Sequence, residues 1–159
     1  MLSLFSVRLA AESAAVGGTP LLPRHSTVAD WAAALGPPSR VLPLYYKEVL
    51  RNTLYLYDEL GIRFWAMHEV VTEWQLVLET KAANVFPKQA YTGALDYRGL
   101  NLPVPLPGRL LATGQLPGFV LDGDAQQYGV TTYRCAGPPL TYTATLSRQT
   151  DNIATISVS

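Results

Sequence analysis

Two histidines and one cysteine, His25, His68 and Cys135, are the side chains best suited to acid-base, nucleophilic or metal chemistry in this sequence. Neither histidine belongs to a His-Glu-x-x-His pattern, in which one helix face presents two zinc ligands. A serine triad is not expected either, because Gly-x-Ser-x-Gly is absent and Ser26 is better explained by its place at a helix start. We interpret His68 as a satisfied or solvent-facing histidine.

Cys135 is the single cysteine, which excludes an intramolecular disulfide and a cysteine-based zinc cage. Arg134 beside it supplies the positive charge that a reactive thiol needs, but the strand-like surroundings favour a buried structural thiol. The glycine patterns that cradle phosphates are absent, so nucleotide hydrolysis is not expected. No cofactor is predicted.

Carboxylates offer two further candidates. Asp122 and Asp124 flank Gly123 and could supply oxygen ligands to calcium, yet the distal glutamate of an EF-hand loop is absent, and a plain β-turn is favoured. Glu69, Glu73 and Glu79 could act as a pair in glycoside hydrolysis, but on a helix they would form a solvated surface. The sequence therefore predicts no metal site and no enzyme.

Aromatic residues are numerous, with 3 Trp, 9 Tyr and 4 Phe. The tryptophans are expected in the core. A tyrosine-rich surface suits protein interfaces or sugar faces, because each ring is apolar and has a polar tip. The tyrosines that carry this alternative are Tyr91, Tyr97, Tyr128, Tyr133 and Tyr142.

Charge is scarce: 24 of the 159 residues are charged, 12 of each sign, and 48% are hydrophobic. A zero formal net charge gives no attraction to nucleic acid or to an anionic membrane. No uninterrupted apolar run is long enough to span a membrane, and no secretory signal is evident. The charges are fewest in residues 1–44 and 91–159, so these ends are expected to be covered by another chain.

The local patterns predict helices in the first half of the chain. Thr27 and Asp30 form a capping box at the start of a short helix that Gly36 ends. A second helix is predicted from Pro43 to Gly61, where Tyr45, Tyr55 and Leu56 widen the apolar surface beyond one core contact. Residues 62–83 fit both helical and strand periods, and a long helix is favoured because a hairpin lacks its turn residues.

The second half of the chain is typical of β-structure. Residues 1–25 are expected to be an extended arm, followed by a single α+β domain over 26–159. That domain comprises a helical part (26–84), a proline-rich spacer (99–108) and a β part (109–159) that forms an antiparallel meander or small sandwich. The last strand has neither charge nor proline to protect an edge, so it is either internal or paired with a neighbouring subunit.

These features favour a non-enzymatic structural subunit of a larger assembly that acts through its arm and an edge strand. A virus or bacteriophage particle is the most natural setting, with a capsid-stabilising, connector or tail role, assembled in the host cytoplasm. A carbohydrate- or small-ligand-binding module that uses surface tyrosines is the alternative. The expected partners are copies of the chain and other subunits of the assembly, without direct nucleic acid contact.

The predicted partner interface consists of apolar residues in the arm, the spacer and the last strand. They are Leu2, Leu4, Phe5, Leu21, Leu22, Pro103, Pro105, Pro107, Ile153, Ile156 and Val158.

Overall fold

The computed structural model describes residues 5–122, 131–137 and 139–159, and most of its regular structure is β-strand. The strands are β1 (Ser6–Leu9), β2 (Ala14–Val16), β3 (Thr19–Pro20), β4 (Arg40–Tyr46), β5 (Val49–Tyr57), β6 (Ile62–Met67), β7 (Val70–Val77), β8 (Ala94–Tyr97), β9 (Leu100–Leu102), β10 (Val120–Leu121), β11 (Thr132–Gly137), β12 (Leu140–Leu146) and β13 (Ile153–Val158). The helices are α1 (Val28–Leu35) and α2 (Arg109–Ala112). The predicted α+β class with two to three helices is therefore wrong.

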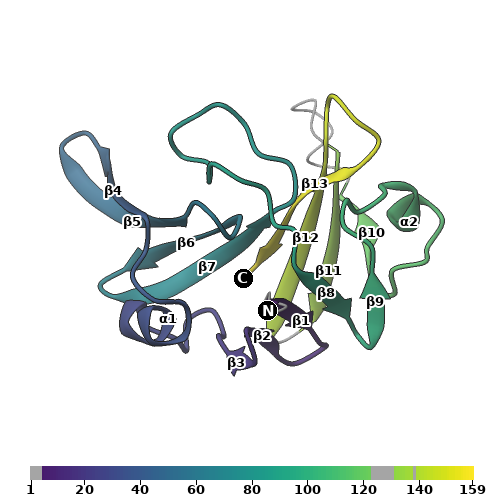
Figure 1. The fold of residues 1–159 in the computed structure, drawn as a ribbon, viewed down its shortest axis with the longest axis horizontal. Coiled ribbons are helices and arrows are strands. Elements are labelled where there is room, and N and C mark those ends of the chain that lie inside the picture. Colours follow the sequence, from purple (N-terminus) through teal and green to yellow (C-terminus); the bar gives the residue numbers. More distant parts are fainter. Residues whose placement is uncertain (1–4, 123–130, 138) are drawn as a thin grey trace.

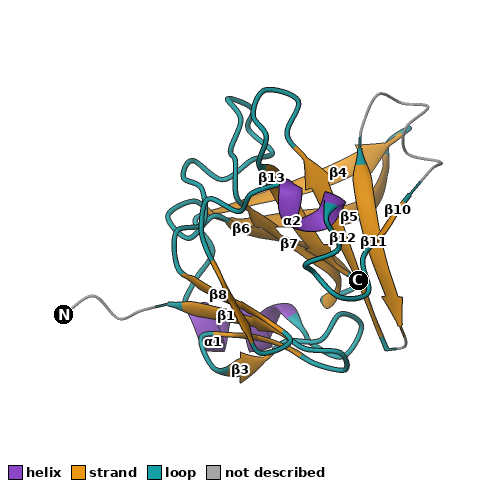
Figure 2. Ribbon diagram, turned by 90° about the vertical axis from the view of Figure 1, so that its right-hand side faces the viewer, coloured by secondary structure: helices purple, strands orange, loops and turns teal. Residues whose placement is uncertain are grey.

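The strands form two sheets (Figure 1). The larger is antiparallel and has the order β10-β11-β12-β13-β7-β6-β5-β4. The smaller has the order β3-β2-β1-β8-β9, and β1 pairs in parallel with β8. Figure 2 shows α1 and the smaller sheet on one side of the larger sheet.

The main core lies between these two layers. Trp31 of α1 is fully buried, with its ring 4.7 Å from Phe64 and 5.5 Å from Trp74 of the larger sheet. Tyr142 joins the layers at the other end, where its hydroxyl donates to the Ala10 carbonyl at 2.6 Å. The expected burial of tryptophans thus holds for Trp31 and Trp74.

The two helices predicted from Pro43 to Gly61 and over 62–83 are wrong, because the hairpins β4–β5 and β6–β7 occupy most of these residues. Their strands are buried on both faces near the middle of the sheet, since Leu56 and Tyr57 are consecutive and both buried. Apolar residues therefore do not strictly alternate with polar ones there, and such a stretch is compatible with both a helical period and a strand period. The period alone could not separate the two structures.

The hairpin turns are made by residues that do not usually signal them. Lys47 and Glu48 join β4 to β5 with φ of 49° and 66°, and His68 and Glu69 join β6 to β7 with φ of 50° and 66°. Two consecutive positive φ angles are typical of a type I′ turn, which normally selects Asn-Gly. Without that signal, the sequence favoured helices.

Replacing Lys47-Glu48 by Asn-Gly distinguishes the two structures. We expect the double substitution to raise the free energy of unfolding by about 0.5–1 kcal/mol, because positive φ is costly for Lys and Glu and free for Gly. In a helix the same glycine would instead cost about 1 kcal/mol. Urea denaturation measures whether the free energy of unfolding rises or falls, and a fall would contradict the hairpin.

Two local predictions are confirmed, and an open alternative is decided. Helix α1 begins after Thr27, whose side chain accepts from the Asp30 amide while Asp30 accepts from the Thr27 amide, and Gly36 caps its end. Strands β11, β12 and β13 form the antiparallel meander. Strand β13 is internal, because it pairs with β12 on one side and β7 on the other. Of the two alternatives for the last strand, the internal position is therefore correct, and the expectation that the chain acts through this strand as a sheet edge is wrong.

Residues 6–20 are not an extended arm. They form β1, β2 and β3 of the smaller sheet, and Val7 and Leu9 are buried in the core. These strands have two to four residues, too few for an alternating pattern to appear in the sequence.

The proline-rich spacer is partly a core segment, since Leu106 is buried and its carbonyl accepts from the Ile153 amide. Among the described residues, neither helix has the length and apolar character needed to cross a bilayer.

Candidate functional site

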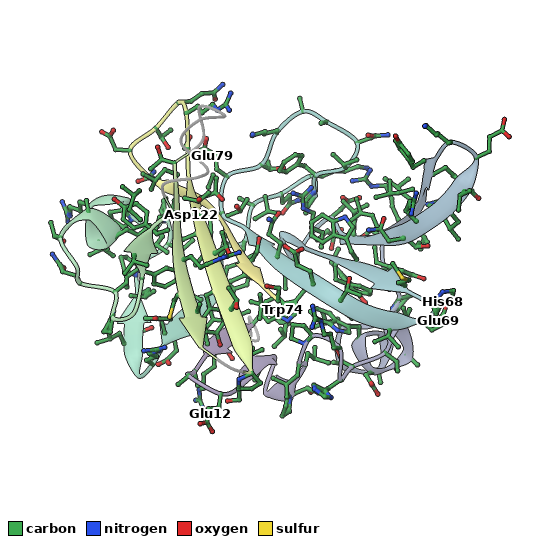
Figure 3. All side chains as sticks on the ribbon, turned by 180° about the vertical axis from the view of Figure 1, so that it is seen from behind. Glu12, His68, Glu69, Trp74, Glu79 and Asp122 are labelled. Atoms are coloured by element: carbon green, nitrogen blue, oxygen red, sulfur yellow. The ribbon has the colours of Figure 1, made fainter. Side chains whose placement is uncertain are left out.

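The residues considered for catalysis do not converge. His25 and His68 are exposed, and Figure 3 shows His68 and Asp122 at opposite sides of the molecule. Cys135 is buried, as predicted, with its Sγ 3.3 Å from Arg98 Nη2 and 3.6 Å from the Tyr97 hydroxyl. The structure thus brings neither histidine to the cysteine.

The carboxylates weighed as ion ligands or as a catalytic pair fall in different places. Gly123 and Asp124 lie outside the described residues, so the turn at 122–124 is not described. Glu69 lies in the β6–β7 turn, Glu73 on β7 and Glu79 after β7, so the helix expected to carry them is absent. Among the described residues, no group of three His, Cys, Asp or Glu side chains is arranged to hold a metal ion.

Most of the tyrosines named for sugar binding serve the core instead. Tyr91, Tyr97 and Tyr142 are buried, and each hydroxyl donates to a main-chain carbonyl. Burial raises the pKa of Tyr142 to about 12. Tyr133 is half-buried, and Tyr128 lies outside the described residues. The three buried rings offer no face to a ligand.

The residues of the predicted interface have varied surroundings. Leu2 and Leu4 lie outside the described residues. Phe5, Leu22 and Pro107 are half-buried, and Pro103 and Pro105 are exposed; the remaining four, Leu21, Ile153, Ile156 and Val158, are buried within the chain itself.

A different apolar surface is exposed on the hairpins at the β4 edge of the larger sheet. Seven large hydrophobic side chains are exposed there, and we call them the hairpin patch: Val41, Tyr45, Tyr46, Val49, Leu50, Met67 and Val70. Tyr45 is 64% exposed and Val49 58% exposed. Strand β4 contains no buried residue, and the distal end of the β4–β5 hairpin projects from the left side of Figure 1. The widened apolar surface around Tyr45 was the sequence signal for this patch.

Cations accompany the aromatic part of the hairpin patch. Lys47 Nζ and the guanidinium carbon of Arg51 both lie 5.4 Å from the centre of the Tyr46 ring. Leu50, Arg51 and Met67 also line a hollow of about 200 Å³ between the two hairpins. The tip of the β4–β5 hairpin thus combines apolar side chains with two positive charges and the acidic group of Glu48, while Glu69 lies in the turn of the other hairpin.

The segment 78–91 lies against the larger sheet on the side away from α1 (Figure 1). Two arginines of the sheet bind its main chain. Arg40 forms an ion pair with Asp58 at 2.7 Å and donates to the Asn84 and Phe86 carbonyls at 2.6 and 2.8 Å. The hydrogen bonds from Arg40 hold the pKa of Asp58 below its usual range. Arg63 donates to the Val85 carbonyl between those two contacts.

A cavity of about 500 Å³ lies beside this covering segment. Arg63, Gln75, Glu79, Lys81, Phe86 and Ser147 are among the residues that line it. The sequence showed no sign of this cavity. Arg63 lies in the stretch predicted as a helix, and Ser147 is far from it in the chain.

A family model described as "Domain of unknown function (DUF7738)" matches residues 14–103. The match extends from β2 to β9 and includes the hairpin patch and both arginines. No curated protein and no solved structure matches the chain.

Proposed function

We propose that this chain, which belongs to the DUF7738 family, is a non-enzymatic subunit that binds another protein through its hairpin patch. The observation that carries the proposal is the tip of the β4–β5 hairpin, where the cross-strand pairs Tyr45–Leu50 and Tyr46–Val49 place four exposed large hydrophobic side chains next to one another. Scattered exposed apolar residues are ordinary, whereas contiguous ones mark interaction surfaces. A virus or bacteriophage particle as the setting stays a prediction from composition.

The edge of the sheet favours side-chain docking over strand addition. Pro43 lies within β4, the outermost strand, and lacks the main-chain donor that an added strand would need. A second copy that paired through its own β4 would meet the same proline. The partner is therefore a protein that covers the side chains of the patch.

Charge specifies the chemistry of that partner. Lys47 and Arg51 lie over Tyr46 at the hairpin tip, and Glu48 is the one acidic residue between β4 and β5. A complementary surface is a groove that receives the hairpin tip, with apolar walls that cover the Tyr45–Leu50 and Tyr46–Val49 pairs and acidic groups that face the two cations. We propose such a protein as the occupant.

Site-specific photocrosslinking in the source cells tests this function. A photoreactive phenylalanine at Tyr45 or Leu50 should form one discrete adduct with another protein, whereas the same probe at Leu100, exposed on the smaller sheet, should not. Combining the probe with Lys47→Glu and Arg51→Glu should lower the adduct yield about tenfold, because like charges then face the acidic groups. Surface changes of this kind should alter stability by less than about 0.5 kcal/mol.

Two outcomes contradict the proposal. Equal crosslinking from Tyr45 and Leu100 would show that the patch has no special role. An adduct with a second copy of the chain, insensitive to charge reversal, would replace the proposed partner by self-association.

A further inference from the structure

The cavity beside Arg63 lies on the face of the larger sheet that bears Gln75 and Thr155. The segment that follows β7 supplies Glu79, Lys81 and Phe86, and the turn between β12 and β13 supplies Ser147. Its volume of about 500 Å³ is within the range of small-molecule sites. Rigid strands therefore form one wall, and two connecting segments form the rest.

Arg63 is a buried cation in this wall without a carboxylate in contact. Arg63 is 7% exposed. Its Nε and Nη2 donate to Gln75 Oε1 at 2.8 and 2.6 Å, and its Nη1 donates to the Val85 carbonyl at 2.6 Å. These acceptors are neutral. Because a guanidinium has five N–H groups, one on each terminal nitrogen is left without an acceptor among the described residues.

The surroundings of Arg63 hold the guanidinium in one orientation. Its central carbon lies 4.1 Å from the Phe86 ring centre and 4.9 Å from that of Trp65. Gln75 is itself fixed, because its Nε2 donates to Ser157 Oγ at 2.8 Å. Burial lowers the pKa of Arg63 to about 10, opposed by the charge of Glu73, so the group remains a cation at neutral pH.

The remaining charges of the lining favour an anion. Lys81 adds a second cation, and Arg148 also lines the cavity. Glu79 is the acidic lining residue, and its two oxygens accept from the Ser147 and Thr150 hydroxyls. The carboxylate is thus occupied by hydroxyl donors and does not pair with Arg63.

We infer that this cavity binds a small molecule through a phosphate or carboxylate group that accepts from Arg63 and lies within reach of Lys81. Such an oxyanion supplies the acceptors that the two remaining N–H groups lack, and the planar guanidinium suits both anions. The inference is independent of the hairpin patch, which lies on other residues.

Titration of the purified full chain with inorganic phosphate and with malonate tests the inference. Calorimetry at constant ionic strength, with sodium chloride as the balancing salt, should give a dissociation constant below about 1 mM for at least one anion. Binding of phosphate alone identifies a phosphate group, binding of malonate alone identifies a carboxylate, and binding of both identifies a site for either oxyanion. Binding of neither overturns the inference.

Matched variants distinguish the cavity from general surface attraction. Lys81→Glu should weaken binding at least tenfold, whereas Lys88→Glu, an exposed lysine outside this lining, should change it less than twofold. Arg63→Gln should abolish binding, and Lys81→Glu keeps the test decisive if Arg63→Gln does not fold. Equal weakening by the two lysine variants would overturn the inference.

Discussion

Trp31→Ala is expected to lower the free energy of unfolding by about 3–5 kcal/mol, the largest effect of any substitution considered for this protein. Trp31 is fully buried, contacts Phe64 and Trp74, and donates from Nε1 to Ser26 Oγ at 3.2 Å. Its removal leaves a cavity between α1 and the larger sheet and takes away the donor to the Ser26 hydroxyl, which keeps only its hydrogen bond to the Leu22 carbonyl at 2.9 Å. Because domains of this kind are stable by only about 5–15 kcal/mol, the loss is a large fraction of the total.

Urea denaturation of Trp31→Ala and of two further variants measures this effect. Trp31→Phe keeps an aromatic ring and should cost about half as much, so it remains measurable if Trp31→Ala does not fold. Ala33→Ser, at an exposed position of the same helix, should change stability by less than about 0.5 kcal/mol. A loss below 1 kcal/mol for Trp31→Ala would show that α1 does not pack on the sheet as described.

Asp58→Asn is expected to cost about 2–3 kcal/mol at pH 7, because it removes the charge that pairs with Arg40 in a partly buried site. Asp58 accepts from Arg40 Nε and Nη2 at 2.8 and 2.7 Å and from the Lys88 amide at 3.1 Å. The side chain of Arg40 is 26% exposed, so water compensates part of the loss. The segment 78–91 should loosen in the variant, since Arg40 also binds its carbonyls.

The pH dependence of the same variant follows from the lowered pKa of Asp58. A carboxyl with a lower pKa in the folded state stabilises the fold above its unfolded pKa of about 3.9. That stabilisation is lost as pH falls through the folded pKa, where the protonated Asp58 resembles Asn. The difference in stability between the wild type and Asp58→Asn should therefore shrink below about pH 4. Exposed Asp151→Asn serves as the control and should show little difference at any pH; a constant gap for Asp58→Asn would contradict the ion-pair explanation.

The candidate sites could be predicted only in part. The clustering of apolar residues around Tyr45 was visible as an excess over one core contact, but its assignment to a helix hid the exposed hairpin. The cavity was not predictable, because Arg63, Lys81 and Ser147 are brought together by β-pairing across distant parts of the chain. No local sequence pattern predicts that β13 lies between β12 and β7 in the sheet.

By itself, the sequence determined the elements whose signals are local. Thr27 and Asp30 cap α1 through hydrogen bonds within four residues, and alternation over Leu140–Leu146 is sufficient for β12 because that strand is buried on one face. Only the tertiary structure decided the hairpins of 40–77, because their apolar residues were compatible with a helical period and Lys47-Glu48 and His68-Glu69 took the turn conformation without glycine. It also decided which apolar residues face solvent, because that depends on which strands end a sheet and not on residue type.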